Sequence, residues 1–238
     1  MCTLVIDFPS AMKTFILLIS LTLLQLLIVL DTLQGGRRTD DHLVPFRPSA
    51  YDQLRPSLYK KLLLTPADCG RMIEFPGGPQ PGESAVSIHC DKRPVADEQC
   101  YVTLTKASSN LSYMMEENLG KRPLEGIERV RVERRDTVIA KSTALAIRAT
   151  WTRALGSIKP RRSDAPIVLD SERIEFWIER PNATPLFGEI PDNPGKSVVA
   201  LVQLGRMLAK YCEAPETLRA SMAENIERDA KRLATGAQ

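Results

Sequence analysis

The sequence has 238 residues, of which 43% are hydrophobic and 26% are charged, and its formal net charge is +3. These are ordinary values for folded soluble protein, so we expect one or two globular domains. The small net charge and the 5% of aromatic residues argue against nucleic acid as a partner, because nucleic-acid-binding domains concentrate basic and stacking side chains.

An uncharged apolar segment, residues 14–30, lies between Lys13 and Asp31. As a helix it would span ~26 Å, close to the ~30 Å thickness of the hydrocarbon core of a bilayer. Residues 1–34 are therefore predicted to be a signal peptide or a signal-anchor, and an uncleaved segment would be the only membrane contact. A buried core helix is the alternative, although such a helix normally carries a polar stripe. The protein is thus expected to be periplasmic or secreted, or held outside the cytosol by a single-pass anchor.

Residues 35–56 contain Gly, Pro, Asp and Arg without apolar periodicity, which is typical of an extended linker. Residues 57–238 are predicted to form one folded domain. Hydrophobic residues alternate with polar ones in four stretches of this domain, and such alternation predicts strands with one buried face. These stretches are Ser84–Cys90, Gln99–Thr105, Ile127–Arg134 and Arg173–Arg180.

Three helices are predicted between and after the strands, because their apolar residues recur at helical spacing. The first is capped by Ser142 or Thr143 and ends at Gly156, the second opens at Pro194, and the third opens at Pro215. Strand pairs with separate helices predict an α+β fold, in which about three amphipathic helices pack on one face of a single antiparallel sheet.

Four cysteines lie in the predicted domain, and an even number in an exported domain favours disulfides. Cys90 and Cys100 stand at the two ends of the loop 91–99, and both point inward in the predicted strands. We therefore predict a bridge between them, and a second bridge between Cys69 and Cys212. The alternative is that all four are small buried hydrophobic residues.

We predict no metal site, because the sequence has no C-x-x-C pair and only two histidines, His42 and His89. His42 is expected to be a solvated linker residue and His89 a surface residue. The stretch Gly195-Lys196-Ser197 resembles the end of a phosphate-binding loop but lacks the preceding glycine, so no cofactor is predicted.

Glu175, Trp177 and Glu179 alternate on the outward side of the last predicted strand. An aromatic ring beside carboxylates suits a ligand-binding surface, and with Arg129 and Arg131 these residues form our candidate site. The alternative is that the two glutamates pair with Arg129 and Arg131 across strands of a solvated sheet face. Catalysis by Glu175 and Glu179 alone is excluded, because four residues of strand separate them by ~13 Å.

The sequence contains no arrangement of a nucleophile with an oriented base. The leading hypothesis is therefore an exported, non-catalytic binding or accessory protein with an unknown envelope or extracellular partner. An extracytoplasmic hydrolase with a site built from scattered residues is the alternative. It would place Glu175 or Glu179 within ~10 Å of another buried carboxylate or of His89. A secreted inhibitor or effector that presents the loop 91–99 is a third hypothesis.

Overall fold

The structure is a computed structural model that describes residues 39–46, 62, 66–77, 82–91, 99–111, 130–161, 172–180 and 182–236. The chain divides into two compact units, Met1–Thr39 and Asp40–Gln238, and every described helix and strand belongs to the second. The predicted signal or anchor segment lies outside the described residues. No helix within the described ranges combines the length and the apolar character that crossing a membrane requires.

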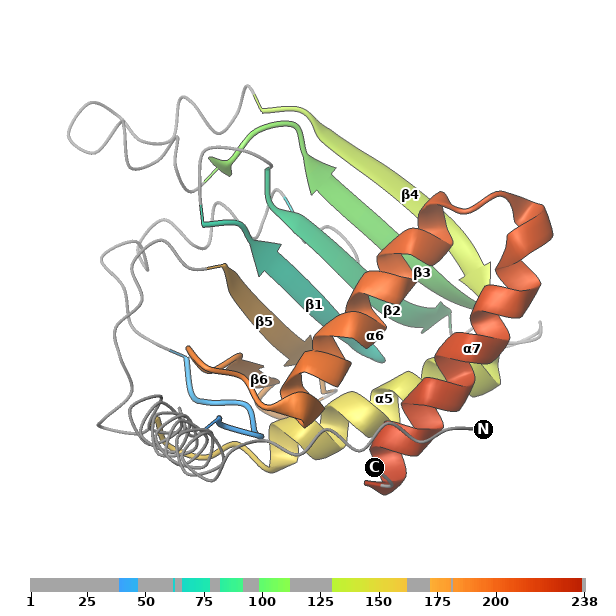
Figure 1. The fold of residues 1–238 in the computed structure, drawn as a ribbon. Coiled ribbons are helices and arrows are strands. Elements are labelled where there is room, and N and C mark those ends of the chain that lie inside the picture. Colours follow the sequence, from blue (N-terminus) through green and yellow to red (C-terminus); the bar gives the residue numbers. More distant parts are fainter. Residues whose placement is uncertain are drawn as a thin grey trace, which may run out of the picture. The chain divides into compact units, whose positions relative to one another are not determined.

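Six strands form one antiparallel sheet in the order β4-β3-β2-β1-β5-β6 (Figure 1). The strands are β1 (Gly70–Phe75), β2 (Ser84–Asp91), β3 (Gln99–Ala107), β4 (Val132–Ile139), β5 (Arg173–Ile178) and β6 (Leu186–Glu189). Within the described ranges, three helices accompany the sheet: α5 (Lys141–Gly156), α6 (Lys196–Glu213) and α7 (Glu216–Thr235). The sequence-based prediction of an α+β fold with one antiparallel sheet and three helices is confirmed.

The main core lies between the sheet and the helices, which Figure 1 shows in front of the same sheet face. Alternation explains this core: the buried residues of β5 on this side are Ile174, Phe176 and Ile178, as the sequence predicted. Trp151 of α5 is fully buried and meets Phe176 edge-on, with ring centroids 5.7 Å apart.

The predicted stripe of the second helix is also buried in α6. Gly205 brings that helix close to β1, because a Cβ at this position would lie 2.2 Å from the Met72 sulfur. The third predicted helix buries less of its stripe: Ile226 is buried, whereas Leu218 is 53% exposed.

The sheet face away from the helices also carries a buried apolar cluster, which the prediction of one buried face missed. Its residues are Leu62, Ile73, Phe75, Ala85, Ala107, Leu111 and Val130, with Trp177 packed against them. Both faces of the sheet are therefore buried over part of their area.

Two local predictions are wrong. The third predicted strand, Ile127–Arg134, is displaced, since β4 spans Val132–Ile139. Ser142 and Thr143 do not cap α5; the residue at its N-cap is Ala140, and both hydroxyl groups donate to Glu227 of α7 instead.

Part of the predicted linker belongs to the fold. Leu43 and Val44 are buried, and Val44 exchanges two backbone hydrogen bonds with Glu189 of β6. The backbone carbonyl of Asp40 likewise accepts a hydrogen bond from the backbone N–H of Gly195, at the start of α6. These backbone pairings do not depend on side-chain periodicity, so the sequence pattern did not reveal them.

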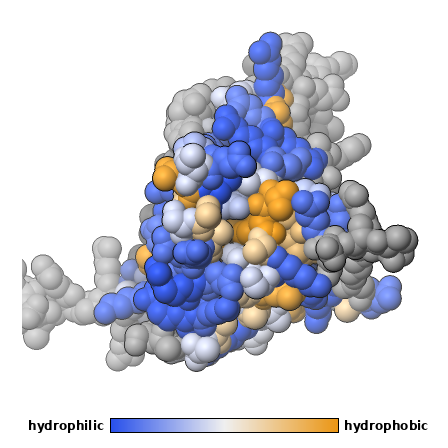
Figure 2. All heavy atoms as spheres, turned by 90° about the vertical axis from the view of Figure 1, so that its right-hand side faces the viewer, coloured by the Kyte–Doolittle hydropathy of each residue, from blue (hydrophilic) through white to orange (hydrophobic). Residues whose placement is uncertain are grey.

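One side of the molecule presents apolar surface. Figure 2 shows a hydrophobic patch bordered by hydrophilic residues on the side where Figure 1 places β4 and α7. Large hydrophobic side chains are exposed on the nearby elements, namely Val138 of β4, Leu145 of α5 and Leu218 of α7.

Candidate functional site

The candidate residues of β5 lie on the sheet face away from the helices. Strand register places six side chains in one row across all six strands, and they change from polar to aromatic along it. From β4 to β6 the row reads Asp136, Thr103, Ser87, Arg71, Trp177 and Phe187.

Arg71 is the centre of this row and is only 3% exposed. Its Nε donates to Ser87 Oγ at 2.8 Å, and its Nη1 lies 3.5 Å from Glu179 Oε1. Burial lowers the pKa of the Arg71 guanidinium, and the charge of Glu179 opposes that shift. Glu179 therefore serves as a charge partner for a buried cation.

At the β4 end of the row, Thr103 Oγ1 donates to Asp136 at 2.5 Å, and Arg134 pairs with the same carboxylate. Partial burial acts to raise the pKa of Asp136, but the hydrogen bonds from Thr103 and Arg134 outweigh it, so the pKa is lowered. His89 lies beside this group, as a partly buried residue stacked on Tyr101 with ring centroids 5.4 Å apart.

Glu175 is not on a solvated face, and this prediction is wrong. Its exposed fraction is 1%, it pairs with Arg173, and it accepts a hydrogen bond of 3.3 Å from Trp177 Nε1. The register sets it directly opposite Glu189 of β6, which is also buried. The outward side of β5 is covered at this end of the strand, and alternation within one strand does not reveal such a cover.

Two guanidinium groups neutralise the adjacent carboxylates. Arg173 contacts both Glu175 and Glu189, and Arg161 contacts Glu189 and Asp192. Because Glu175 and Glu189 touch one guanidinium, the proximity expected of a hydrolase is present. A carboxyl group that acts as a general acid, however, needs surroundings that disfavour its charge. Here cations contact both groups, which is typical of a structural ion-pair cluster.

Arg131, the one predicted arginine that the structure describes, does not join this cluster. Arg129 lies outside the described residues, and Arg131 is an exposed residue just before β4. Three strands separate β4 from β5 in the sheet. Cross-strand pairing of Glu175 or Glu179 with Arg131 is therefore not found: Glu175 pairs with Arg173 of its own strand, and Glu179 pairs with Arg71 of β1.

Trp177 belongs to an aromatic group at the β5–β6 edge. Its ring stacks on Phe187 with centroids 5.5 Å apart, and Phe46 meets Phe187 edge-on at 6.3 Å. Phe187 is 43% exposed, and the Arg173 guanidinium lies 4.6 Å from the centroid of Phe46. This group therefore combines an exposed apolar surface with the Arg173 guanidinium, which packs against it.

The four cysteines that the structure describes form one disulfide, Cys90–Cys100, the pair predicted from the loop that they flank. The second predicted bridge is wrong: Cys212 Sγ lies 3.6 Å from the Val102 carbonyl oxygen, and Cys69 Sγ lies 3.7 Å from Cys90 Sγ. Burial raises the pKa of the Cys212 thiol to about 11.

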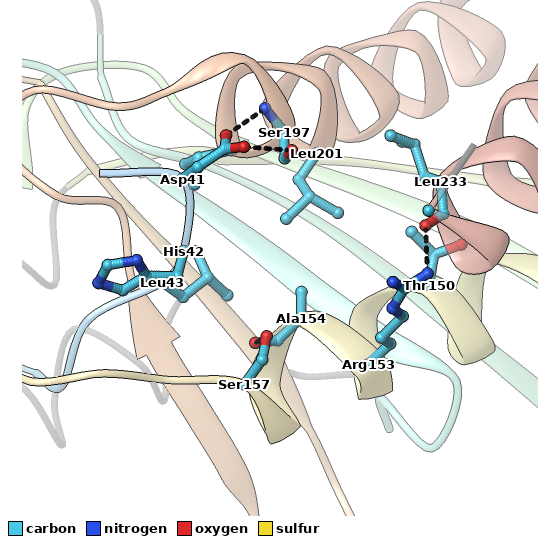
Figure 3. Close-up of a pocket in the computed structure, with 12 residues that line it drawn as sticks. Asp41, His42, Leu43, Thr150, Arg153, Ala154, Ser157, Ser197, Leu201 and Leu233 are labelled. Atoms are coloured by element: carbon cyan, nitrogen blue, oxygen red, sulfur yellow. Dashed lines mark hydrogen bonds between the residues drawn. The ribbon is translucent and has the colours of Figure 1, made fainter. Parts of the chain in front are cut away.

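A pocket that sequence reasoning missed opens where the folded N-terminal segment, residues 39–46, meets the three helices (Figure 3). Its volume is about 170 Å³. Its apolar lining comes from elements far apart in the sequence, and includes Leu43, Ala154, Val198, Leu201 and Leu233. Figure 3 shows the side chains of Leu201 and Ala154 directed into the same space.

Charged groups on the rim of this pocket are held by hydrogen bonds. Asp41 accepts the backbone N–H of Ser197 at 2.6 Å and its hydroxyl at 2.8 Å, so it caps α6 from another part of the chain. Arg153 donates to the Ala234 carbonyl at 2.6 Å, near the C-terminus of α7. The ring of His42, predicted to be a linker residue, points away from the apolar space (Figure 3).

The helix stripes were the only sequence signal for this pocket. Leu201 and Ala154 belong to stripes that were predicted to be core, and nothing in the pattern indicated that the core would open between them.

Among the described residues, no group of three His, Cys, Asp or Glu side chains is arranged to hold a metal ion. Comparison of the chain with protein-family models, curated proteins and solved structures finds no match.

Proposed function

We propose that this chain is an exported, non-catalytic binding protein, and that the pocket between α5, α6 and α7 receives the apolar part of a small amphipathic ligand. The observation that carries the proposal is the chemistry of the pocket: an apolar lining surrounded by charged and hydroxyl groups that are fixed in place. Small-molecule sites commonly combine such a lining with a few oriented polar groups.

Two further features support export. Residues 14–30 form an uncharged apolar segment of the length that export signals and anchors use. The Cys90–Cys100 disulfide fits an oxidising compartment outside the cytosol.

The size of the pocket indicates a short hydrocarbon chain as a probe. Burying about six methylene groups at ~0.8 kcal/mol each would give a dissociation constant of about 1 mM or tighter. Three octyl compounds, namely octanoate, octylamine and octanol, keep the chain constant and vary the charge of the head group. Chemical-shift titration by NMR measures affinities in this range, and we expect at least one compound to show saturable binding.

The matched variants are Ala154→Leu and Ala149→Leu, which make the same change on one helix. Ala154 lines the pocket, whereas Ala149 is exposed on α5. We expect Ala154→Leu to weaken binding of the octyl compound at least tenfold, while Ala149→Leu leaves it unchanged. Equal affinity in the two variants, or no binding of any octyl compound, would overturn the pocket assignment.

Export is tested separately, with the full chain expressed in an exporting host. Fractionation and intact mass should find it outside the cytosol with Cys90 and Cys100 protected from alkylation under denaturing, non-reducing conditions. A full-length cytosolic product with both thiols alkylated would remove export from the proposal and leave the pocket to be judged by ligand binding.

The hydrolase alternative has one observation in its favour, the adjacency of Glu175 and Glu189. The contacts of both carboxylates with Arg173 favour a structural role for the pair. We therefore propose binding and not hydrolysis as the function.

A further inference from the structure

Three cysteines gather at one end of the sheet. Cys90 is the second-last residue of β2, Cys100 faces it from β3, and Cys69 immediately precedes β1. Cys69 Sγ lies 3.7 Å from Cys90 Sγ, which is already bonded to Cys100. All three are buried, with exposed fractions of 2%, 8% and 1% for Cys69, Cys90 and Cys100.

Gly70 explains why Cys69 reaches this position. By alternation along β1, Met72 faces the helices and Cys69 would face the opposite side. Gly70 has a φ of +128°, a conformation that side chains other than hydrogen rarely adopt, and it packs beneath the Trp151 ring. The backbone changes direction there, and Cys69 joins the helix-side core together with Cys90 and Cys100.

We propose that these three residues form a disulfide-exchange site, in which Cys90 pairs with either Cys100 or Cys69. The Cys69 thiol loses its proton, and its sulfur attacks Cys90 Sγ. A Cys69–Cys90 bond forms, the Cys90–Cys100 bond breaks, and Cys100 leaves as a thiolate that takes up a proton. One disulfide and one thiol are present before and after, so the step needs neither an oxidant nor a reductant.

The position of the sulfurs favours this internal reaction over reaction with external thiols. Burial keeps small thiols in solution away from the disulfide, whereas Cys69 needs to move by less than about 2 Å to reach bonding distance from Cys90. Exchange would move the covalent link from β2–β3 to β1–β2. It would thereby release the chain between Cys90 and Cys100 and tie the start of β1 to the end of β2.

Trypsin separates the cysteines, which makes the test direct. Cleavage after Lys61, Arg71, Lys92 and Lys106 yields the peptides 62–71, 72–92 and 93–106, each with one of the three cysteines. The full-length oxidised protein is incubated at pH 8.5, quenched with acid, alkylated under denaturing conditions and mapped without reduction. We expect peptide 62–71 linked to 72–92, with Cys100 alkylated, beside the original pair.

Three variants distinguish exchange from scrambling. In Cys69→Ser, peptides 72–92 and 93–106 should remain linked and Cys100 should never be alkylated. In Cys212→Ser, the mixture should match that of the wild-type protein, because Cys212 takes no part. In Cys100→Ser refolded from denaturant in the presence of oxidised glutathione, Cys69 and Cys90 should become linked.

Two results would overturn the proposal. One is a wild-type protein that keeps only the Cys90–Cys100 pair at pH 8.5. The other is alkylated Cys100 in Cys69→Ser at the wild-type level, because exchange would then not involve Cys69. The wild-type experiment does not depend on whether Cys100→Ser folds, so the proposal remains testable in either case.

Discussion

At the scale of single residues, a glycine can be required by close packing or be free to change. Gly70 and Gly156 illustrate these two cases. A Cβ on Gly70 would lie 2.2 Å from Trp151 Cε3, and its φ is +128°. A Cβ on Gly156, the last residue of α5, would meet nothing within 4 Å.

We predict that Gly70→Ala destabilises the protein by at least about 2 kcal/mol, because it adds backbone strain and a clash with a fully buried ring. Gly156→Ala should change the free energy of unfolding by no more than about 1 kcal/mol, in the stabilising direction. Urea unfolding followed by tryptophan fluorescence measures both. Equal stability of the two variants would mean that Gly70 is not held against Trp151.

At the scale of helices and strands, single-strand alternation predicted burial well on the helix side and poorly on the other. Ile174, Phe176 and Ile178 of β5 are buried as predicted. The same pattern assigned Glu175 to solvent, but Glu175 is buried, where it pairs with Arg173 of its own strand and lies opposite Glu189 of β6. Periodicity records which side chains share a face, and it contains no information about what covers that face.

The order of strands was also outside the reach of the pattern. Arg131 was expected near Glu175 because both lie in predicted strands that could pair, yet three strands separate β4 from β5. The pocket was unpredictable for the same reason: Leu43, Ala154 and Leu201 meet through tertiary packing, and no local sequence pattern links them. The Cys90–Cys100 pair was predictable, because a short loop brings its ends together.

Polar contacts join α7 to α5. At the N-terminal end of α5, Glu227 of α7 makes these contacts. Its carboxylate accepts the hydroxyl groups of Ser142 and Thr143 at 2.9 and 2.7 Å and pairs with Lys231 at 2.6 Å. The hydrogen bond from Lys231, followed by those from Thr143 and Ser142, lowers the pKa of Glu227 to about 2.

We predict that Glu227→Gln lowers the free energy of unfolding by about 1 kcal/mol at pH 7. The folded-state pKa lies below the ordinary value of 4.5, so the ionised carboxylate stabilises the fold above pH 4.5. This contribution is lost as the pH falls from about 4.5 toward 2, and the difference between variant and wild type should narrow there. Glu224→Gln, an exposed position on α7, is the control and should stay within about 0.5 kcal/mol of the wild type. A difference independent of pH would contradict the role of the carboxylate charge.

At the scale of the whole molecule, the sheet joins strands that lie far apart in the sequence. The two middle strands, β2 and β1, come early in the sequence, whereas β5 and β6 come late and lie on the far side of β1. The folded N-terminal segment then pairs with β6, and Asp41 caps α6. Stability therefore depends on long-range contacts, and the Cys90–Cys100 disulfide is the covalent link inside this arrangement.

We predict that reducing this disulfide lowers the free energy of unfolding by about 2–3 kcal/mol, because the reduced unfolded chain gains the freedom that a short closed loop denies it. Guanidinium unfolding of the oxidised and reduced wild-type protein measures the difference. The Cys90→Ser/Cys100→Ser double variant is the control, since reductant should not change its unfolding midpoint. A wild-type midpoint that is insensitive to reductant would mean that the disulfide does not restrict the unfolded chain. A midpoint shift in the double variant would instead assign the effect to the remaining cysteines, which the structure buries as thiols.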